Sequence, residues 1–514
     1  MNVWLVTLGS SDVQVKDADL WSDWYREVKG SLYGIDRARF NPTRLENSDD
    51  VPYRLAARVL GIAYEKLGEA VTEQLVFPLL EQFQRQLLDK AEAIDNIVVL
   101  TSDQQYAFSE EERESYRCPY WQDTGLLYPI VCDYLQSLFP AAQISQLSLS
   151  PDGPGQGLDD WDAVLKLVRR KIAALDFEPS KAVLNKVSVS HQAGTPAISS
   201  AVQFSSLAKF GDRVEFLVSS EYRPEQTRLI DSSEYLSALR LQEAKALLDR
   251  YDYSGVKTLI GGVLDRQTQT LLDAGIQWNL ADFQNFQKLL LDSNFVQSED
   301  CMWWSFGYES AYLAVIRHRQ GNIVDALFHS FRSVEGLICI WAETKYKACI
   351  IHDKKGSPQI TEKIQAILPE YWKWIEEKHH NWLKDQREKN QVRVNSGEQA
   401  LLLSTGLFSQ TLYTLLETVR PESKKNKYMK TVLYSAKDER NQQFHRLLGL
   451  QEENLFQAWK AKNAEEWKDV LLGCLNFISE VNPIGNFESI ESASLMAKVH
   501  ESLKSAIEAY ETKV

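Results

Sequence analysis

The sequence predicts an N-terminal α/β domain built on a parallel sheet, followed by an all-α C-terminal half. Two observations support this fold class. Strand-like runs alternate with helical periodicity up to about residue 220, and beyond residue 232 strand-like runs nearly vanish. Alternating strands and helices are typical of a parallel sheet covered on both faces. A chain of 514 residues is long enough for about two or three domains.

The first half contains the strand signals. Short runs rich in aliphatic and β-branched residues predict strands at 3–8, 97–101, 144–149, 186–190 and 214–219. Apolar residues at helical spacing predict helices at 53–88, 126–138, 160–174 and 195–210. The interval 13–52 has mixed character, and the sequence assigns it no role.

The second half shows almost only helical periodicity. The predicted helices are 236–250, 256–274, 281–292, 308–345, 360–385, 398–418, 430–448, 452–461 and 464–480. Within an apolar stretch, Arg332 and Glu335 stand out, because charges there are expected to be paired or to line a cleft.

Composition narrows the class of protein. The net charge of −14 argues against a general nucleic-acid coat, although four lysines lie within residues 424–430. No apolar run is long enough to span a bilayer, so no membrane association is expected. Six scattered cysteines without a Cys-x-x-Cys pair predict reduced thiols in a cytoplasmic protein, and no metal site is expected.

Polar loops follow several of the predicted strands. Ligands of open parallel sheets bind at the carboxyl ends of the strands. One loop follows the first strand, a second follows strand 97–101, and a third, with Thr195 as N-cap and Pro196 in the first helical turn, follows strand 186–190. Such a helix start favours an anion, so we expect a nucleotide-like ligand here. The candidate contacts are Gly9, Ser10, Ser11, Thr101, Gln192, Gly194 and Thr195.

The segment from Arg440 to His445 has residues suited to RNA cleavage. RNA carries its own nucleophile, the 2′-hydroxyl, so a protein needs only to move protons and stabilise an anionic phosphorus. His445 can exchange a proton near neutral pH, Arg440 can hold phosphate oxygens, and Asn441 can orient the phosphate or the imidazole. Five residues apart, at ~100° per residue, the Arg440 and His445 side chains do not share one helix face. Either local distortion of the helix or a site shared between two chains would resolve this.

Taken in order, these motifs resemble the CRISPR-associated ribonucleases that join a CARF domain to a HEPN domain. The start of the chain resembles the first CARF strand and its loop, and residues 193–196 resemble the family's Gly-Gly-Thr-Pro element. Residues 321–336 are similar to the first HEPN helices, and Arg440 to His445 matches the HEPN motif of an arginine followed by four to six residues and a histidine. Ala193 departs from the first glycine of the Gly-Gly-Thr-Pro element.

The resemblance implies a fold and a mechanism. It implies a Rossmann-like CARF sensor at 1–225, a helical linker region at 226–300 and a HEPN domain at 301–514. CARF domains of the family dimerise and bind cyclic oligoadenylate made by type III CRISPR effectors in antiviral defence, and a tetra-adenylate is expected here rather than a hexa-adenylate. The paired HEPN domains then cut single-stranded RNA without a metal or other catalytic cofactor, leaving 2′,3′-cyclic phosphate ends. Arg440, Asn441 and His445 would be catalytic. The chain is thus expected to be a homodimer without stable DNA binding.

Several alternatives stay open. Some relatives also degrade their activator, and the sequence does not decide this for the present pocket. The protein could be a cyclic-nucleotide sensor or regulator with an inactive HEPN fold, although both Arg440 and His445 are present. A HEPN toxin or RNA-binding module unrelated to CRISPR defence is another alternative, and the large N-terminal α/β domain argues against a stand-alone toxin. A dinucleotide-dependent enzyme is disfavoured because the Gly-x-Gly-x-x-Gly fingerprint is missing.

Overall fold

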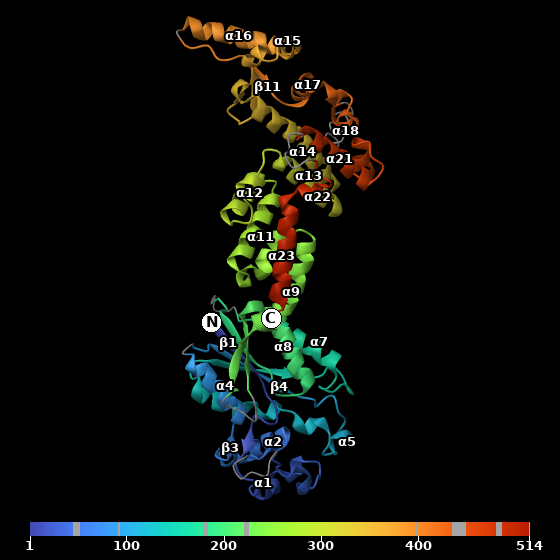
Figure 1. Ribbon diagram of the computed structural model, residues 1–514. Coiled ribbons are helices and arrows are strands. Elements are labelled where there is room, and N and C mark those ends of the chain that lie inside the picture. The colour runs from blue at the N-terminus through green and yellow to red at the C-terminus, as the bar shows by residue number, and fades with distance from the viewer. Residues whose placement is uncertain are drawn as a thin grey trace. The chain divides into compact units, whose positions relative to one another are not determined.

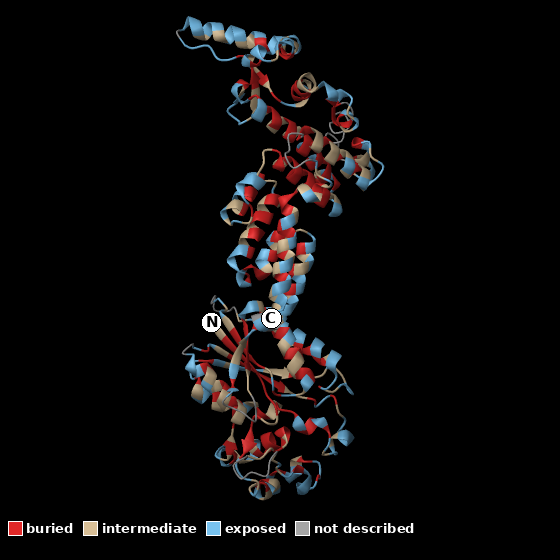
Figure 2. Ribbon diagram, in the orientation of Figure 1, coloured by how far each residue is buried: buried red, intermediate tan, exposed pale blue. Residues whose placement is uncertain are grey.

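The computed structural model describes residues 1–44, 52–90, 93–177, 183–219, 226–396, 398–433, 449–479 and 486–512. The chain divides into two compact units, Met1–Ser237 and Ala238–Val514, and each is described by itself (Figure 1). In the first unit the buried residues follow the strands, and in the second they follow the inner faces of the helices (Figure 2).

The first unit is built on a six-stranded sheet with the order β5-β4-β1-β6-β7-β8. The first five of these strands are parallel to one another, which confirms the predicted parallel sheet. The sequence does not predict β8, which pairs antiparallel with β7 and has only four residues. The strands are β1 (Asn2–Thr7), β4 (Asn96–Ser102), β5 (Gln143–Leu149), β6 (Lys186–Ser190), β7 (Val214–Val218) and β8 (Arg228–Asp231).

Helices cover both faces of this sheet because the side chains of each strand alternate in direction. On β1, Trp4 and Val6 belong to one buried apolar cluster, whereas Val3 and Leu5 belong to a second. The first cluster includes α4 (Pro78–Asp89) and α6 (Tyr128–Leu138), and the second includes α7 (Trp161–Ala173) and α8 (Pro196–Phe210).

The predicted continuous helix 53–88 is wrong. Gly68, with a φ of +57°, ends a first helix, and Pro78 starts a new one because proline lacks the N–H that a continuing helix needs. The interval consists of α2 (Ala57–Leu67), α3 (Glu69–Thr72), β3 (Leu75–Val76) and α4. Within 13–52, β2 (Gln14–Val15) pairs with β3, and α1 (Trp21–Val28) buries two tryptophans in the first cluster.

The second unit is mainly helical. Gly321, with a φ of +76°, divides the predicted helix 308–345 into α13 and α14. The helices are α9 (Ser232–Asp249), which begins at the end of the first unit, α10 (Tyr253–Ile260), α11 (Arg266–Asn279), α12 (Phe283–Asp292), α13 (Ser305–Arg319), α14 (Ile323–Lys345), α15 (Pro369–Lys378), α16 (His380–Asn395), α17 (Ser409–Val419), α18 (Lys427–Thr431), α20 (Glu452–Ala458), α21 (Ala464–Ile478), α22 (Ile490–Ala493) and α23 (Leu495–Glu511).

A small antiparallel sheet corrects the prediction that this half is all-α. Its order is β11-β10-β9, and it replaces the starts of the predicted helices 360–385 and 398–418. The turn between β9 and β10 explains the difference: the Asp353 carboxylate accepts hydrogen bonds from the backbone nitrogens of Lys355 and Ser357, and Gly356 has a φ of +81°. The strands are β9 (Ile350–His352), β10 (Pro358–Thr361) and β11 (Ser404–Gly406).

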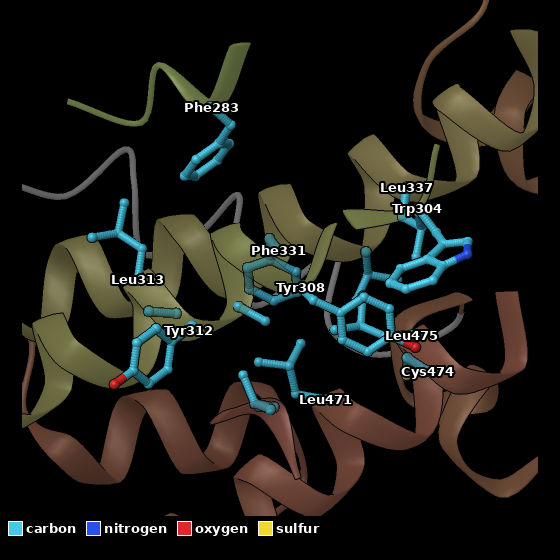
Figure 3. Packing of buried hydrophobic residues seen from close by; sticks show 14 of the residues in the cluster. Phe283, Trp304, Tyr308, Tyr312, Leu313, Phe331, Leu337, Leu471, Cys474 and Leu475 are labelled. Atoms are coloured by element: carbon cyan, nitrogen blue, oxygen red, sulfur yellow. The ribbon is translucent and has the colours of Figure 1, made fainter. Parts of the chain in front are cut away.

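The core of the second unit lies between α13, α14 and α21. Figure 3 shows Tyr308, Tyr312 and Phe331, from the first two helices, facing Leu471 and Leu475 of α21. All six cysteines of the chain are free thiols.

One buried carboxylate holds α23 in this core. Glu309 of α13 is fully buried and accepts hydrogen bonds from the backbone nitrogen of Leu495 at 2.6 Å, from the Ser494 hydroxyl at 2.8 Å and from the Trp278 indole at 2.9 Å. Leu495 is the first residue of α23, so the carboxylate faces the start of that helix. Burial outweighs these hydrogen bonds and raises the pKa of Glu309 to about 7.

Candidate functional site

Two loops of the first unit close on one another at the carboxyl edge of the sheet. Because β1 lies between β4 and β6 and all three strands are parallel, the segments that follow them leave from one edge. A Cβ on Gly9 would lie 2.9 Å from the Gly194 backbone nitrogen and 3.3 Å from the Ala193 Cβ. A side chain at position 9 would therefore push the loops apart. The structure brings together two of the predicted ligand contacts, one after β1 and one after β6.

Ser10 and Ser11 lie half-buried in the loop after β1. The backbone of this loop is fixed, since the Gly9 nitrogen donates to the Asp12 carboxylate at 2.6 Å and the Gln14 amide donates to the Ser11 carbonyl at 2.7 Å. Neither serine hydroxyl bonds to another described residue. Both remain available to phosphate or ribose oxygens.

Thr195 starts α8 as the sequence predicts. Its hydroxyl accepts from the Ile198 backbone nitrogen at 3.2 Å and donates to the Leu158 carbonyl at 2.7 Å. Gly194 precedes it with a φ of +93°, which is a conformation that favours glycine. The first backbone N–H groups of this 15-residue helix are consequently presented at the edge where Gly9 lies.

Gln192 and Thr101 occupy different positions from these residues. The Gln192 amide bonds the backbone of Ser219 twice, donating to its carbonyl at 3.0 Å and accepting from its nitrogen at 2.6 Å. Gln192 therefore stands at the rim and ties the loop after β6 to the end of β7. Thr101 is 1% exposed, and its hydroxyl accepts from the Gln146 amide on β5 at 2.9 Å. The structure does not bring Thr101 out to the edge.

A buried network behind the edge is not among the predicted site residues. The Gln104 side chain accepts from the Leu158 nitrogen at 2.8 Å and donates to Asp123 at 3.0 Å. Asp123 in turn pairs with Arg58 at 2.9 Å, and both side chains are largely buried. Leu158 is the residue whose carbonyl accepts from Thr195, so this network supports the start of α8. The sequence signal was a single arginine inside the apolar run that becomes α2.

His191 directly follows β6, and the sequence assigns it no role. Its Nδ1 is 2.9 Å from the Ser199 hydroxyl of α8, and its ring packs edge-on against Phe216. Burial lowers the pKa of His191, so the ring is neutral at pH 7.

Arg440, Asn441 and His445 lie outside the described residues, but the chain on either side of them is anchored. On the N-terminal side, Met429 and Val432 are buried in the core of the second unit. On the C-terminal side, the Trp459 indole donates to the Ser330 hydroxyl of α14 at 3.0 Å, and its ring stacks on Phe331 with centroids 4.9 Å apart. Residues 434–448 are therefore bracketed by two segments fixed in the same core.

A pocket of about 650 Å³ lies along α14, next to this anchor, and contains Arg332 and Glu335. The Glu335 carboxylate accepts from the Tyr413 hydroxyl, and the Arg332 guanidinium lies 5.9 Å from the Phe283 ring. In the part of the chain that the structure describes, no three His, Cys, Asp or Glu side chains gather as a metal site. No helix there is long and apolar enough to cross a membrane.

No family model and no curated protein matches the chain. Solved structures do, and one of them is described as Csm6 of Enterococcus italicus bound to cyclic hexa-2′-fluoro-hexa-dAMP. The match covers 82% of this chain and 95% of that chain, with a TM-score of 0.51 and 14% sequence identity. The chain has the fold of Csm6.

The likeness to Csm6 confirms the predicted resemblance at the level of the fold. A mixed α/β sheet unit joined to a largely helical unit fits a CARF domain combined with a HEPN domain. At 14% identity the likeness to Csm6 transfers the fold and not the roles of individual residues.

Proposed function

We propose that this protein is an endoribonuclease of type III CRISPR antiviral defence that is switched on by cyclic oligoadenylate. The observation that carries the proposal is the Csm6 fold, because the Csm6 chain it matches is described as bound to a cyclic hexa-adenylate analogue. In this proposal residues 1–225 form the CARF sensor, 226–300 a helical linker region and 301–514 the HEPN domain.

The activator would bind at the carboxyl edge of the sheet. Backbone N–H groups at the start of α8 and the hydroxyls of Ser10 and Ser11 suit phosphate and ribose oxygens. The close approach of Gly9 and Gly194 supports this assignment, because it leaves backbone rather than side chains at the floor of the site. Thr195 and Gln192 would hold the loops that border the ring.

RNA cleavage would occur at Arg440, Asn441 and His445. In the proposed reaction the RNA 2′-hydroxyl loses a proton and attacks the adjacent phosphorus, and the 5′-oxygen leaves with a proton, which yields a 2′,3′-cyclic phosphate. His445 would transfer a proton, Arg440 would stabilise the phosphorane charge, and Asn441 would orient the phosphate. Because Arg440 and His445 do not share a helix face, two chains would form the site together as a homodimer.

The test is cleavage of a fluorogenic single-stranded RNA in the presence of EDTA, with cyclic tetra-adenylate, cyclic hexa-adenylate or neither. Cutting that depends on one ring would support the proposal and name the activator, and we expect the tetra-adenylate. Recovery of the cyclic oligoadenylate as a linear product would show that the protein degrades its activator. RNA cleavage by the folded protein without any cyclic oligoadenylate would refute the proposed sensor role of the first unit. A folded protein that never cleaves RNA would refute the proposed nuclease activity.

A further inference from the structure

The pocket along α14 combines apolar side chains with the Arg332 guanidinium and the Glu335 carboxylate, which accepts from the Tyr413 hydroxyl. We call it the Phe408 pocket. It is lined by residues of α14, of the β9–β10 hairpin and of the segment after β11, among them Phe328, Phe331, Arg332, Ser357, Pro358 and Phe408. Phe331 also stacks on Trp459, so the pocket lies beside the anchor that follows the proposed nuclease segment.

Phe408 presents an exposed ring in a fixed position. The residue is 64% exposed, and Phe328, which also lines the pocket, is 47% exposed. The Phe408 ring nevertheless lies against the backbone of Gly406, so closely that a Cβ at position 406 would collide with it. Ser409 follows with a φ of +51°, a conformation that non-glycine residues rarely adopt. One face of the ring is thus supported by backbone, and the residue remains open to solvent.

The cations around this pocket lack carboxylate partners. Residues 345–363 contain five lysines and two acidic residues, in a chain whose net charge is −14. Within the described residues, none of Arg332, Lys354 and Lys355 forms an ion pair with a carboxylate within 4.0 Å, and Asp353 acts on Lys355 only from beyond that distance. The nearest acidic side chain in the turn, Asp353, is held by the backbone nitrogens of Lys355 and Ser357.

The neighbouring helix α16 provides a contrast. Its four basic residues each pair with a carboxylate: Lys384 with Glu388, Arg387 with Glu376, Lys389 with Asp385 and Arg393 with Glu398. Cations that are neutralised within the protein gain little from an added phosphate. The cations beside the Phe408 pocket form no ion pair with a described residue, so they can still gain a phosphate as a partner.

We propose that the Phe408 pocket binds single-stranded RNA, with a base stacked on Phe408 and flanking phosphates held by Arg332 and the Lys354–Lys355 turn. Fixed aromatic rings beside cations are how proteins hold single strands without reading their sequence. A second copy of the chain is a poorer occupant, because lysines are depleted from the cores of protein interfaces. This inference rests on the proposed function. It places part of the RNA substrate at a site away from the bond that is cut.

The experiment measures RNA affinity separately from cleavage. The parent is the full chain with His445→Ala, and the probe is a fluorescein-labelled oligouridylate of about a dozen nucleotides, followed by fluorescence anisotropy. Phe408→Ala should weaken binding by about fivefold or more. Phe204→Ala, a ring that is 63% exposed on α8, is the matched control and should leave affinity unchanged.

Salt dependence tests the phosphate contacts. Replacing both Lys354 and Lys355 by alanine should make the slope of log affinity against log salt less steep by about 1.4, since each phosphate contact on a single strand contributes about 0.7. The double variant Lys384→Ala with Lys389→Ala removes the same charge from ion pairs and should leave the slope unchanged. Light scattering on every variant records the oligomeric state.

The outcomes separate the two proposals. Unchanged RNA affinity in Phe408→Ala would overturn the RNA pocket, and a changed oligomeric state with unchanged affinity would assign the surface to a second copy. If the pocket variants lose RNA affinity but the wild type cuts RNA independently of any cyclic oligoadenylate, the pocket stands and the proposed activation fails. A folded parent that binds no RNA overturns both.

Discussion

Replacing Glu309 by glutamine should remove a specific pH dependence of stability from the second unit. The pKa of Glu309 is raised to about 7 in the folded protein from an ordinary value of 4.5. A raised carboxyl pKa means that the folded state favours the protonated form. The stabilisation is therefore complete below pH 4.5 and is lost as the pH rises through 7.

The magnitude follows from the shift in pKa. A difference of about 2.5 units corresponds to about 3.4 kcal/mol at full ionisation, and about 2.5 kcal/mol of this falls between pH 5 and pH 8. His329 and His500 act in the opposite sense, because burial lowers the pKa of each to about 4. Their neutral forms are favoured by folding, so their stabilisation is lost as the pH falls. Both histidines are present in the wild type and in Glu309→Gln, so their contribution cancels when the unfolding free energies of the two proteins are subtracted.

The assay is urea unfolding at pH 5 and pH 8, followed by tryptophan fluorescence. From pH 5 to pH 8, the unfolding free energy of the wild type should fall by about 2.5 kcal/mol relative to that of Glu309→Gln. Glu501→Gln, at an exposed position of α23, the helix whose start the Glu309 carboxylate holds, should track the wild type. If the unfolding free energies of wild type and Glu309→Gln change equally between pH 5 and pH 8, the reasoning is refuted. Such a result would mean that burial does not raise the pKa of this carboxyl toward 7.

Three further predictions concern the proposed sites. His445→Ala should slow RNA cleavage by about 10²–10⁴-fold with unchanged activator binding, and a variant as fast as wild type would remove its role as acid or base. Gly9→Ala should weaken cyclic oligoadenylate binding, measured by calorimetry, by about 1–3 kcal/mol because its Cβ strikes the facing loop. The control Gly30→Ala, whose Cβ meets nothing within 4 Å, should bind normally. Asp123→Asn should lower the unfolding free energy of the first unit by about 1.5–3 kcal/mol, because it removes the buried carboxylate that pairs with Arg58 and leaves Asp103 as its carboxylate partner. Asp152→Asn, at an exposed pair, should unfold like the wild type.

The sequence predicts the parallel sheet and the start of α8 because both leave local signals. Three of the parallel strands are short apolar runs, β5 and β6 place apolar residues between polar ones, and Thr195-Pro196 is a local capping pattern. The support behind the ligand edge is not local. Arg58 and Asp123 are 65 residues apart, and only the fold shows that they pair. Their partner Gln104 lies in the loop after β4, whereas the sequence predicts a ligand contact at Thr101, inside that strand.

In the second unit, tertiary contacts override periodicity. The predicted helix 360–385 begins inside β10, which forms because the turn at Asp353 and Gly356 returns the chain onto β9. Helix α23 escaped prediction although its apolar spacing is regular, and the residue that fixes its start, Glu309, lies 186 positions earlier. The predictions for Arg440, Asn441 and His445 fall outside the described residues and stay predictions.

The packing of α23 has a consequence for how the protein is made. Its partners in the second unit lie far back in the chain: Glu511 bonds Lys245 across 266 positions, and His500 bonds Tyr253 across 247. Contacts of such separation form slowly, because a long loop must close before they contribute. On the ribosome, the first unit emerges whole and can fold while the second is still being synthesised. The segment bearing Arg440 and His445 leaves the ribosome before α23 does. The helical unit is thus completed late, so a nascent chain would carry a folded first unit, the proposed sensor, well before it carries a complete second unit, the proposed nuclease.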